Sequence, residues 1–589
     1  MFKFRIISLM LMFFFASVYV FAQTPDEKKV ERRKQQNALL EQIAKDAEAL
    51  RLPENRALVL AKLADGFWNT DEKRARQLFQ AAINDLVTAQ TEVEAEKKQT
   101  GNLYGLIYGT APRQEILTLL ANHDAEFALD AFYKSRPAKI VQSLAEANNT
   151  EKKDTESSQY ASNEMNFEQS LISKMSDQNP QRALKLFRES LAKGVTYEAI
   201  NLLEKLKIKD LDLANQLAAE IADKLLATDF EKDSQAASLT LSFIGEYGKK
   251  SEPNTKTIKL EEKTLRDLTA KIVKNILKSE EGSGYEAEYI LPLIEKYTPE
   301  SLAAVKRRKA KYDKENQREE YDAYTKLIES NPSPEKLLSE ADKFPDEIKS
   351  QIYYSAAEKI AQTGNIEGAK KLIASKLPEG ERESYLTQIN YNLIQQAITA
   401  EKYDEAAFLI NQIPVENSRF YFLIQLATTI YQKNPAENKT KALSVLNQVR
   451  SMIPQSAETL EDISLLMQMA ATVAEIDAEQ AFPILESLTY QMNEYIEAAA
   501  IVGKYRSDGS VRRGEIIVNS YGSVAGLNSL TQVLTTLKNK DFGRATAFVS
   551  SFQRPEVRVS LEMQLIDNSS VADTPVGIGS SNVLVGKSQ

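Results

Sequence analysis

Residues 388–406 read QINYNLIQQAITAEKYDEA, and this stretch decides the fold. Its apolar residues recur three and four positions apart, which is the periodicity of an amphipathic helix. A turn follows, and a second helix begins around the small residue Ala406. Stretches beginning at Gln351, Gln425 and Gln468 repeat this layout, so the four glutamines lie 37, 37 and 43 residues apart. Repetition at this period predicts an array of helix pairs.

The second helices share a small residue near their start, which lets each one approach its partner helix closely. These residues are Ala369, Ala406, Ala442 and Ala481. The segments Lys402-Tyr403-Asp404-Glu405-Ala406 and 364–369 look like the turn and signature alanine of tetratricopeptide repeats. Residues 350–490 therefore resemble the tetratricopeptide-repeat class of α-solenoids, although the period is nearer 37 than that family's 34 residues. The resemblance implies an all-α, right-handed solenoid of antiparallel helix pairs, and a related helix-pair repeat is equally admissible.

The N-terminal half contains a looser repeat, in which a phenylalanine follows an alanine by four positions. The pairs are Ala75 and Phe79, Ala128 and Phe132, and Ala183 and Phe187. Helix starts are predicted where a capping side chain precedes proline, at Asn179, Thr298 and Ser333. Glu515 to Tyr521 is the exception to the helical pattern and resembles a short strand.

Composition divides the chain into segments. We expect a signal peptide (1–22), an N-terminal helical repeat region (23–145), a mobile polar linker (146–163), a middle helical region (164–330), tetratricopeptide-like helix pairs (331–500), an insertion containing glycine and arginine (501–526), a final helix pair (527–566) and a disordered tail (567–589).

The N-terminus indicates export. Lys3 and Arg5 precede an apolar run from Ile6 to Ala22, and polar sequence begins at Gln23. This is the pattern of a cleaved secretory signal peptide, with a retained membrane anchor as the rival interpretation. No later segment is apolar for long enough to cross a bilayer. A secreted chain without cysteine fits a bacterial periplasm or extracellular milieu.

Composition also excludes several kinds of site. With no cysteine and one histidine, His123, the chain cannot form thiolate sites or a paired-histidine metal site. The formal net charge of −9 argues against nucleic acid as a partner. The sequence contains no nucleotide-binding or nucleophile-elbow motif. We therefore expect a non-catalytic protein without metal or cofactor.

Two groups of residues are candidates for binding a partner. The first lies on one face of the first helices of successive pairs, where tyrosine and amide side chains would meet a peptide or a helix: Gln351, Tyr354, Glu358, Gln388, Tyr391, Gln395 and Gln425. These side chains would otherwise serve packing and solubility. The second group is four cations in the 501–526 insertion, suited to an acidic partner or a sugar polymer: Lys504, Arg506, Arg512 and Arg513. The alternative for this segment is a tolerated insertion without function.

The leading hypothesis is an exported scaffold or adaptor that binds an unidentified protein or peptide. One alternative is an envelope glycan-cleaving enzyme that uses a carboxylate on a superhelix like that of lytic transglycosylases. The other is a structural envelope protein that self-associates. The enzyme hypothesis predicts a carboxylic acid in an apolar pocket, and the scaffold hypothesis predicts tyrosine and glutamine facing solvent.

Overall fold

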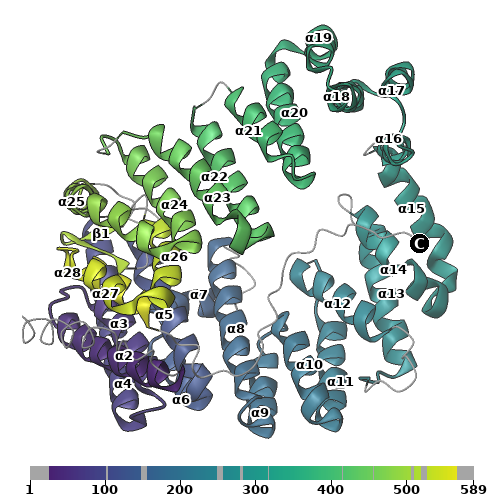
Figure 1. Ribbon diagram of the computed structural model, residues 1–589. Coiled ribbons are helices and arrows are strands. Elements are labelled where there is room, and N and C mark those ends of the chain that lie inside the picture. The colour runs from purple at the N-terminus through teal and green to yellow at the C-terminus, as the bar shows by residue number, and fades with distance from the viewer. Residues whose placement is uncertain are drawn as a thin grey trace, which may run out of the picture. The chain divides into compact units, whose positions relative to one another are not determined.

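The chain folds into helices that a computed structural model describes over most of its length (Figure 1). The described residues are 25–100, 104–147, 155–231, 233–248, 257–278, 283–315, 318–413, 416–454, 457–505, 510–518 and 527–566. The expected signal peptide, residues 1–22, and the expected tail, residues 567–589, lie outside them. Two compact units are formed, unit 1 by residues 1–112 with 453–589, and unit 2 by residues 113–452. These boundaries do not coincide with the expected divisions at 145 and 330, because the two ends of the chain share unit 1.

Helix α5 (Tyr104–His123) contains the unit boundary, and unit 2 continues from it as a run of helices. They are α6 (Ala125–Lys134), α7 (Ala138–Ala147), α8 (Thr155–Met175), α9 (Pro180–Leu191), α10 (Glu198–Lys209), α11 (Leu211–Ala227), α12 (Ser234–Tyr247), α13 (Glu262–Lys278), α14 (Ser283–Tyr297), η1 (Pro299–Ser301), α15 (Leu302–Glu315), α16 (Arg318–Glu329), α17 (Pro334–Glu340), η2 (Ala341–Lys343), α18 (Asp346–Gln362), α19 (Ile366–Lys376), α20 (Glu379–Thr399), α21 (Tyr403–Asn411), α22 (Glu416–Lys433) and α23 (Pro435–Ser451).

The expected helix pairs are present in unit 2 as α18 with α19, α20 with α21, and α22 with α23, drawn in green in Figure 1. The small residue near the start of each second helix is buried in each pair, at Ala369, Ala406 and Ala442. A side chain larger than a methyl group has no room there, because the two helices pack against each other at that point. The helical-repeat fold expected from the alanine spacing is therefore confirmed.

The turns between paired helices repeat as well. Gly364 and Glu401 each follow the first helix of a pair, α18 and α20, with positive φ values of 87° and 60°, and Asn331, between α16 and α17, has a φ of 47°. A residue in this left-handed conformation ends a helix by redirecting the chain. The pair that begins with α22 departs from this pattern, since Asn434, which directly precedes and caps α23, has a φ of −153°.

The N-terminal part of unit 2 is held by a buried network of charges. The Arg113 guanidinium donates to both carboxylate oxygens of Glu164, at 2.8 and 3.0 Å, and Arg136 donates to Glu164 at 2.8 Å. Glu168 accepts from Lys193 at 2.7 Å and from the Tyr133 hydroxyl at 3.1 Å. Burial and the adjacent Glu168 carboxylate raise the pKa of Tyr133, so its hydroxyl remains a donor in this network.

The expected mobile polar linker at 146–163 differs from the structure in its second half, which is helical. Helix α8 begins at Thr155, inside that segment, and continues to Met175. Glu164 and Glu168 occupy buried positions of α8, where Glu164 pairs with Arg136, between α6 and α7, and Glu168 pairs with Lys193, just after α9. The spacing of apolar residues cannot predict this helix as a core element, because its buried positions include paired charged residues.

Unit 1 combines helices from both ends of the chain. They are α2 (Pro25–Ala47), α3 (Pro53–Phe67), α4 (Glu72–Thr100), α24 (Leu460–Ile476), α25 (Ala478–Gly503), α26 (Leu527–Lys540), α27 (Phe542–Ser550) and α28 (Pro555–Leu565), with strands β1 (Val511–Arg512) and β2 (Glu515–Ile516). Helix α2 packs against α28, and α3 also contacts α28. The expected final helix pair at 527–566 is thus three helices. None of the helices described is long and apolar enough to cross a membrane.

The alanine–phenylalanine motif of the N-terminal half marks core positions in both units. Ala75 and Phe79 are fully buried in α4, and the equivalent residues of α6 and α9 are fully buried in unit 2. Each of these helices begins with an acidic or amide cap, as at Asn179, whose Oδ1 accepts from the Arg182 N–H at 3.1 Å. The predicted cap at Ser333 is also confirmed. The predicted helix start at Thr298 is confirmed, since η1 begins at Pro299 and α15 follows it directly, but the Thr298 hydroxyl makes no capping hydrogen bond.

Candidate binding face

The seven residues of the first candidate group lie on α18, α20 and α22, the first helices of three successive pairs. Gln351, Tyr354 and Glu358 belong to α18 and are partly buried. Gln388, Tyr391 and Gln395 belong to α20, and Gln425 belongs to α22. The positions within each helix are three or four residues apart, so each set occupies one helical face.

A side chain that the sequence did not single out, Asn392, connects α20 to α18. Its Nδ2 donates to the Tyr354 hydroxyl oxygen at 3.0 Å and to Glu358 Oε1 at 2.8 Å. Its Oδ1 accepts from Gln388 Nε2 at 3.1 Å. One amide therefore joins three of the candidate residues into a network across two repeats.

Gln395 and Gln425 connect α20 to α22 in the same way. The Gln395 amide donates to Gln425 Oε1 at 2.9 Å, and the Gln425 amide donates back to Gln395 Oε1 at 3.3 Å. Each side chain uses one donor and one acceptor in this pair. An amide group carries two donors and two acceptor lone pairs, so hydrogen-bonding capacity is left for a partner.

Aromatic side chains accompany the amides. The rings of Tyr354 and Tyr385 lie 5.1 Å apart, and those of Tyr391 and Phe422 lie 5.6 Å apart. Burial, together with the Glu358 carboxylate, raises the pKa of Tyr354 to about 12. Tyr354 is thus part of the packing between repeats, whereas Tyr391 is 41% exposed and Tyr421 is 52% exposed.

The central parts of α20 and α22 carry no charged residue, although charged residues stand at the start of α20 and near both ends of α22. No charged residue occurs from position 384 to 399, or from 420 to 432, in a chain in which 27% of residues are charged. The exposed side chains in these stretches include Ser384, Thr387, Gln388, Tyr391, Gln396, Tyr421 and Gln425. We call these seven residues the uncharged face. Of its members outside the predicted group, Tyr421 is the largest, and the gap in the charge pattern was the signal that could have found it.

The second candidate group is engaged within the chain itself. Arg512 forms a two-bond ion pair with the buried Glu54, at 2.6 and 2.5 Å, and also contacts Glu92 and Glu96. Arg513 pairs with Glu92 and Glu96 at 2.9 and 2.7 Å. These cations therefore neutralise carboxylates of α3 and α4. Lys504 is exposed just beyond α25, and Arg506 lies outside the described residues.

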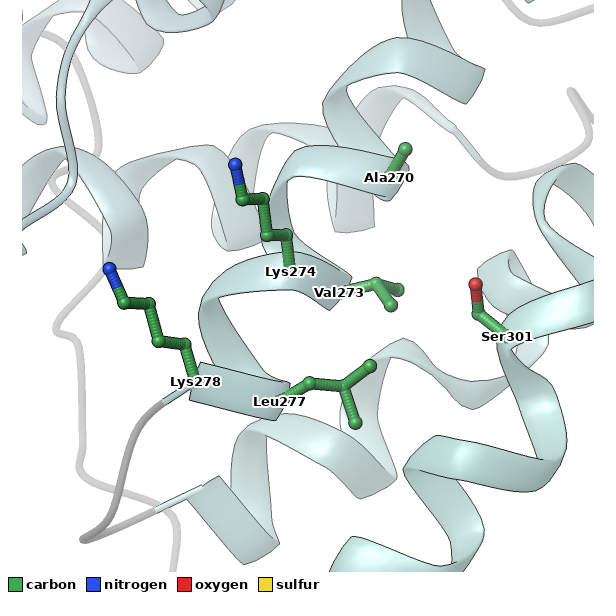
Figure 2. Close-up of a pocket in the computed structure, with 6 residues that line it drawn as sticks. All are labelled: Ala270, Val273, Lys274, Leu277, Lys278 and Ser301. Atoms are coloured by element: carbon green, nitrogen blue, oxygen red, sulfur yellow. The ribbon is translucent and has the colours of Figure 1, made fainter.

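A surface cavity of about 490 Å³ lies beside α13. It is lined by Ala270, Val273, Lys274, Leu277, Lys278 and Ser301. Figure 2 shows Val273 and Leu277 pointing towards Ser301, while the lysine side chains extend to the other side of the helix. None of these six lining residues carries a carboxylate. Among the described residues, no cluster of three or more metal-ligating side chains is found.

Comparison with known proteins adds little to this geometry. No protein-family model matches the chain. No curated protein matches it either. A solved structure described as a circular tandem repeat protein with novel repeat topology and enhanced subunit contact surfaces is similar over 86% of this chain and 98% of its own, with 15% identity and a TM-score of 0.18.

Proposed function

We propose that the protein is an exported, non-catalytic helical-repeat scaffold that binds a protein or peptide partner on the uncharged face of α20 and α22. Helical repeats offer an extended surface on which side chains, rather than the fold, select the partner. Export is supported by the basic and apolar pattern of residues 1–22.

The observation that carries the proposal is the composition of the uncharged face. The centres of protein interfaces are depleted of charged residues and enriched in aromatic ones. Antibody paratopes combine rigid tyrosines with small hydrogen-bonding side chains for the same reason, since tyrosine supplies contact area at low entropic cost. Tyr391 and Tyr421 among serine, threonine and glutamine reproduce this combination on a chain that is otherwise strongly charged.

The same composition predicts how binding responds to salt. Screening weakens attraction between exposed charges, and the uncharged face contributes none. Binding there should therefore persist at high ionic strength, unlike capture of a basic partner by the chain's net charge of −9.

The experiment is affinity capture from a bacterial envelope extract with the full chain as bait, at low and high salt. The variant is Tyr391→Ser with Tyr421→Ser, because both rings are exposed. Tyr354 is left unchanged, since its packing and its bond to Asn392 serve the fold. Phe408→Ser with Tyr490→Ser is the matched control, as both are exposed aromatics elsewhere, at 63% and 68%.

A partner that is retained by the wild type and the control at both salt concentrations, but lost from the tyrosine variant, would support the proposal. Equal retention of the partner by all three chains would show that it binds outside the uncharged face. With no captured partner, sedimentation at increasing concentration tests self-association, and release of fragments from purified peptidoglycan tests the glycan-cleaving alternative.

A further inference from the structure

Glu562 is a buried carboxyl group at the contact between α2 and α28, the first and last of the described helices of unit 1. It belongs to α28, its side chain is fully buried, and α28 packs against α2. Glu562 Oε1 accepts from Gln42 Nε2 of α2 at 3.0 Å. The second oxygen, Oε2, is buried without any hydrogen-bond partner. An ionised carboxylate in this position would leave an uncompensated charge out of contact with water.

The charges around Glu562 balance only when it carries a proton. Asp46 lies one turn beyond Gln42 on α2, and Arg558 lies one turn before Glu562 on α28. Arg558 Nε is 3.6 Å from Asp46 Oδ2. The Arg558 guanidinium is therefore the cation near two carboxyl groups, and it forms its ion pair with Asp46.

The charged groups on the other elements packed against α28 have partners of their own. Glu54 of α3 pairs with Arg512, Glu515 of β2 accepts from Asn55, Lys538 of α26 donates to the Gln564 carbonyl, and Arg544 of α27 pairs with Glu486. On α28 itself, Glu556 pairs with Arg554. Burial and the Asp46 carboxylate raise the pKa of Glu562 from 4.5 to about 7, against the opposing effect of Arg558.

We propose that Glu562 is a proton-dependent latch that holds α2 against α28 when protonated and loosens this contact when its proton is lost to solvent. The protonated carboxyl keeps Oε1 as the acceptor for Gln42 and makes the buried cluster neutral. Loss of the proton places a net negative charge in the contact, which separation of α2 relieves by admitting water.

The direction of the pH effect follows from linkage. A carboxyl whose pKa is raised in the closed state binds its proton more tightly there than in the open state. Closure is strongest below the ordinary pKa of 4.5 and weakens as the pH rises to about 7. Above that pH, it changes no further. Between these limits, the opening equilibrium should rise by up to about tenfold per pH unit.

Hydrogen–deuterium exchange of the full chain, read by mass spectrometry between pH 5 and pH 8.5, measures this opening in peptides from residues 25–47. After correction for the intrinsic pH dependence of amide exchange, the wild type should lose protection in α2 as the pH approaches 7. The variant Glu562→Gln should keep α2 protected throughout, because it cannot ionise. Glu48→Gln, an exposed position in the turn that follows α2, is the control and should behave as the wild type.

Asp46→Asn provides a second test that does not alter the buried side chain. With the neighbouring negative charge removed and Arg558 released, the pKa of Glu562 should be raised less, so the pH-dependent loss of protection should be smaller and should end at a lower pH. The proposal is overturned if the wild type shows no pH-dependent loss in α2, or if Glu562→Gln retains it. Should Glu562→Gln not fold, an unshifted profile in Asp46→Asn overturns it equally.

Discussion

Glu515 and Asn55 are joined by a hydrogen bond of 2.7 Å, although 460 residues separate them in the sequence. The Glu515 carboxylate also accepts from the backbone N–H groups of Arg51 and Leu52, at 2.9 and 3.3 Å. The Asn55 side chain also binds the backbone that follows Glu515, donating to the Ile516 carbonyl and accepting from the Val518 N–H. Helix α3 has no capping side chain of its own, so the β1–β2 hairpin supplies acceptors at its start.

Replacing Glu515 with alanine should therefore destabilise the start of α3. The side chain is buried, and its loss removes one of the two acceptors of the Asn55 amide and leaves the backbone N–H groups of Arg51 and Leu52 without this acceptor, which should lower the free energy of unfolding by about 3 kcal/mol. Hydrogen exchange of residues 53–67 measures the effect. Glu479→Ala, which removes a largely exposed partner of Arg544, should change stability by less than about 0.5 kcal/mol. Equal effects of the two substitutions would contradict this role for Glu515.

The buried charge network of unit 2 gives a second prediction. Arg113→Met removes four donated hydrogen bonds, two of them to Glu164 and the others to the Phe132 carbonyl and the Ser135 hydroxyl. The buried Glu164 carboxylate would then pair with Arg136 alone, and the free energy of unfolding should decrease by about 3–5 kcal/mol.

The midpoint of urea unfolding, followed by circular dichroism, measures that loss. Arg182→Met is the matched control, because Arg182 pairs with Glu126 at the surface and should contribute about 0.5 kcal/mol or less. If the two substitutions lower the free energy of unfolding equally, the buried network stabilises unit 2 no more than an ordinary surface ion pair does.

The sequence predicted the repeat because the repeat depends on local spacing. A methyl group at Ala369 or Ala406 is required wherever two helices approach closely, so the alanine recurs with the structural unit. The long-range arrangement has no such signature. Nothing near Glu515 in the sequence indicates that Asn55 binds it. In the same way, the sequence around Arg512 does not indicate that this cation pairs with Glu54.

The candidate binding face was predicted in part for the same reason. Helical spacing places Tyr391 and Gln395 on one face of α20. Whether a tyrosine is exposed depends on the neighbouring repeat, which spacing does not describe. Tyr354 is therefore packed against Tyr385, while Tyr421, outside the predicted group, is half exposed.

Lysine side chains that cap neighbouring helices give a third prediction. Lys271 of α13 donates to the carbonyls of Leu225 and Leu226 at the end of α11, at 2.9 and 2.7 Å, and also contacts the Thr228 carbonyl. These carbonyls carry the negative end of the helix dipole. Lys271→Met should cost about 1 kcal/mol, measured as a lower thermal unfolding midpoint. Lys274→Met, one turn away and exposed, should leave the midpoint nearly unchanged, and a similar decrease would argue against a capping role.

Glu401 gives the last prediction, because it has a φ of 60° at the turn position where the preceding repeat has Gly364 with a φ of 87°. A side chain with a Cβ is strained in this conformation and glycine is not. Glu401→Gly removes that strain but also the surface ion pair with Lys433, whose two side chains are 58% and 52% exposed. The net result should be a gain of about 0.5 kcal/mol, since such pairs contribute little. Glu401→Ala loses the ion pair and keeps the strain, so it should be neutral or slightly destabilising. Thermal unfolding of the three chains decides the point, and equal midpoints for the glycine and alanine variants would show that the turn is not strained at Glu401.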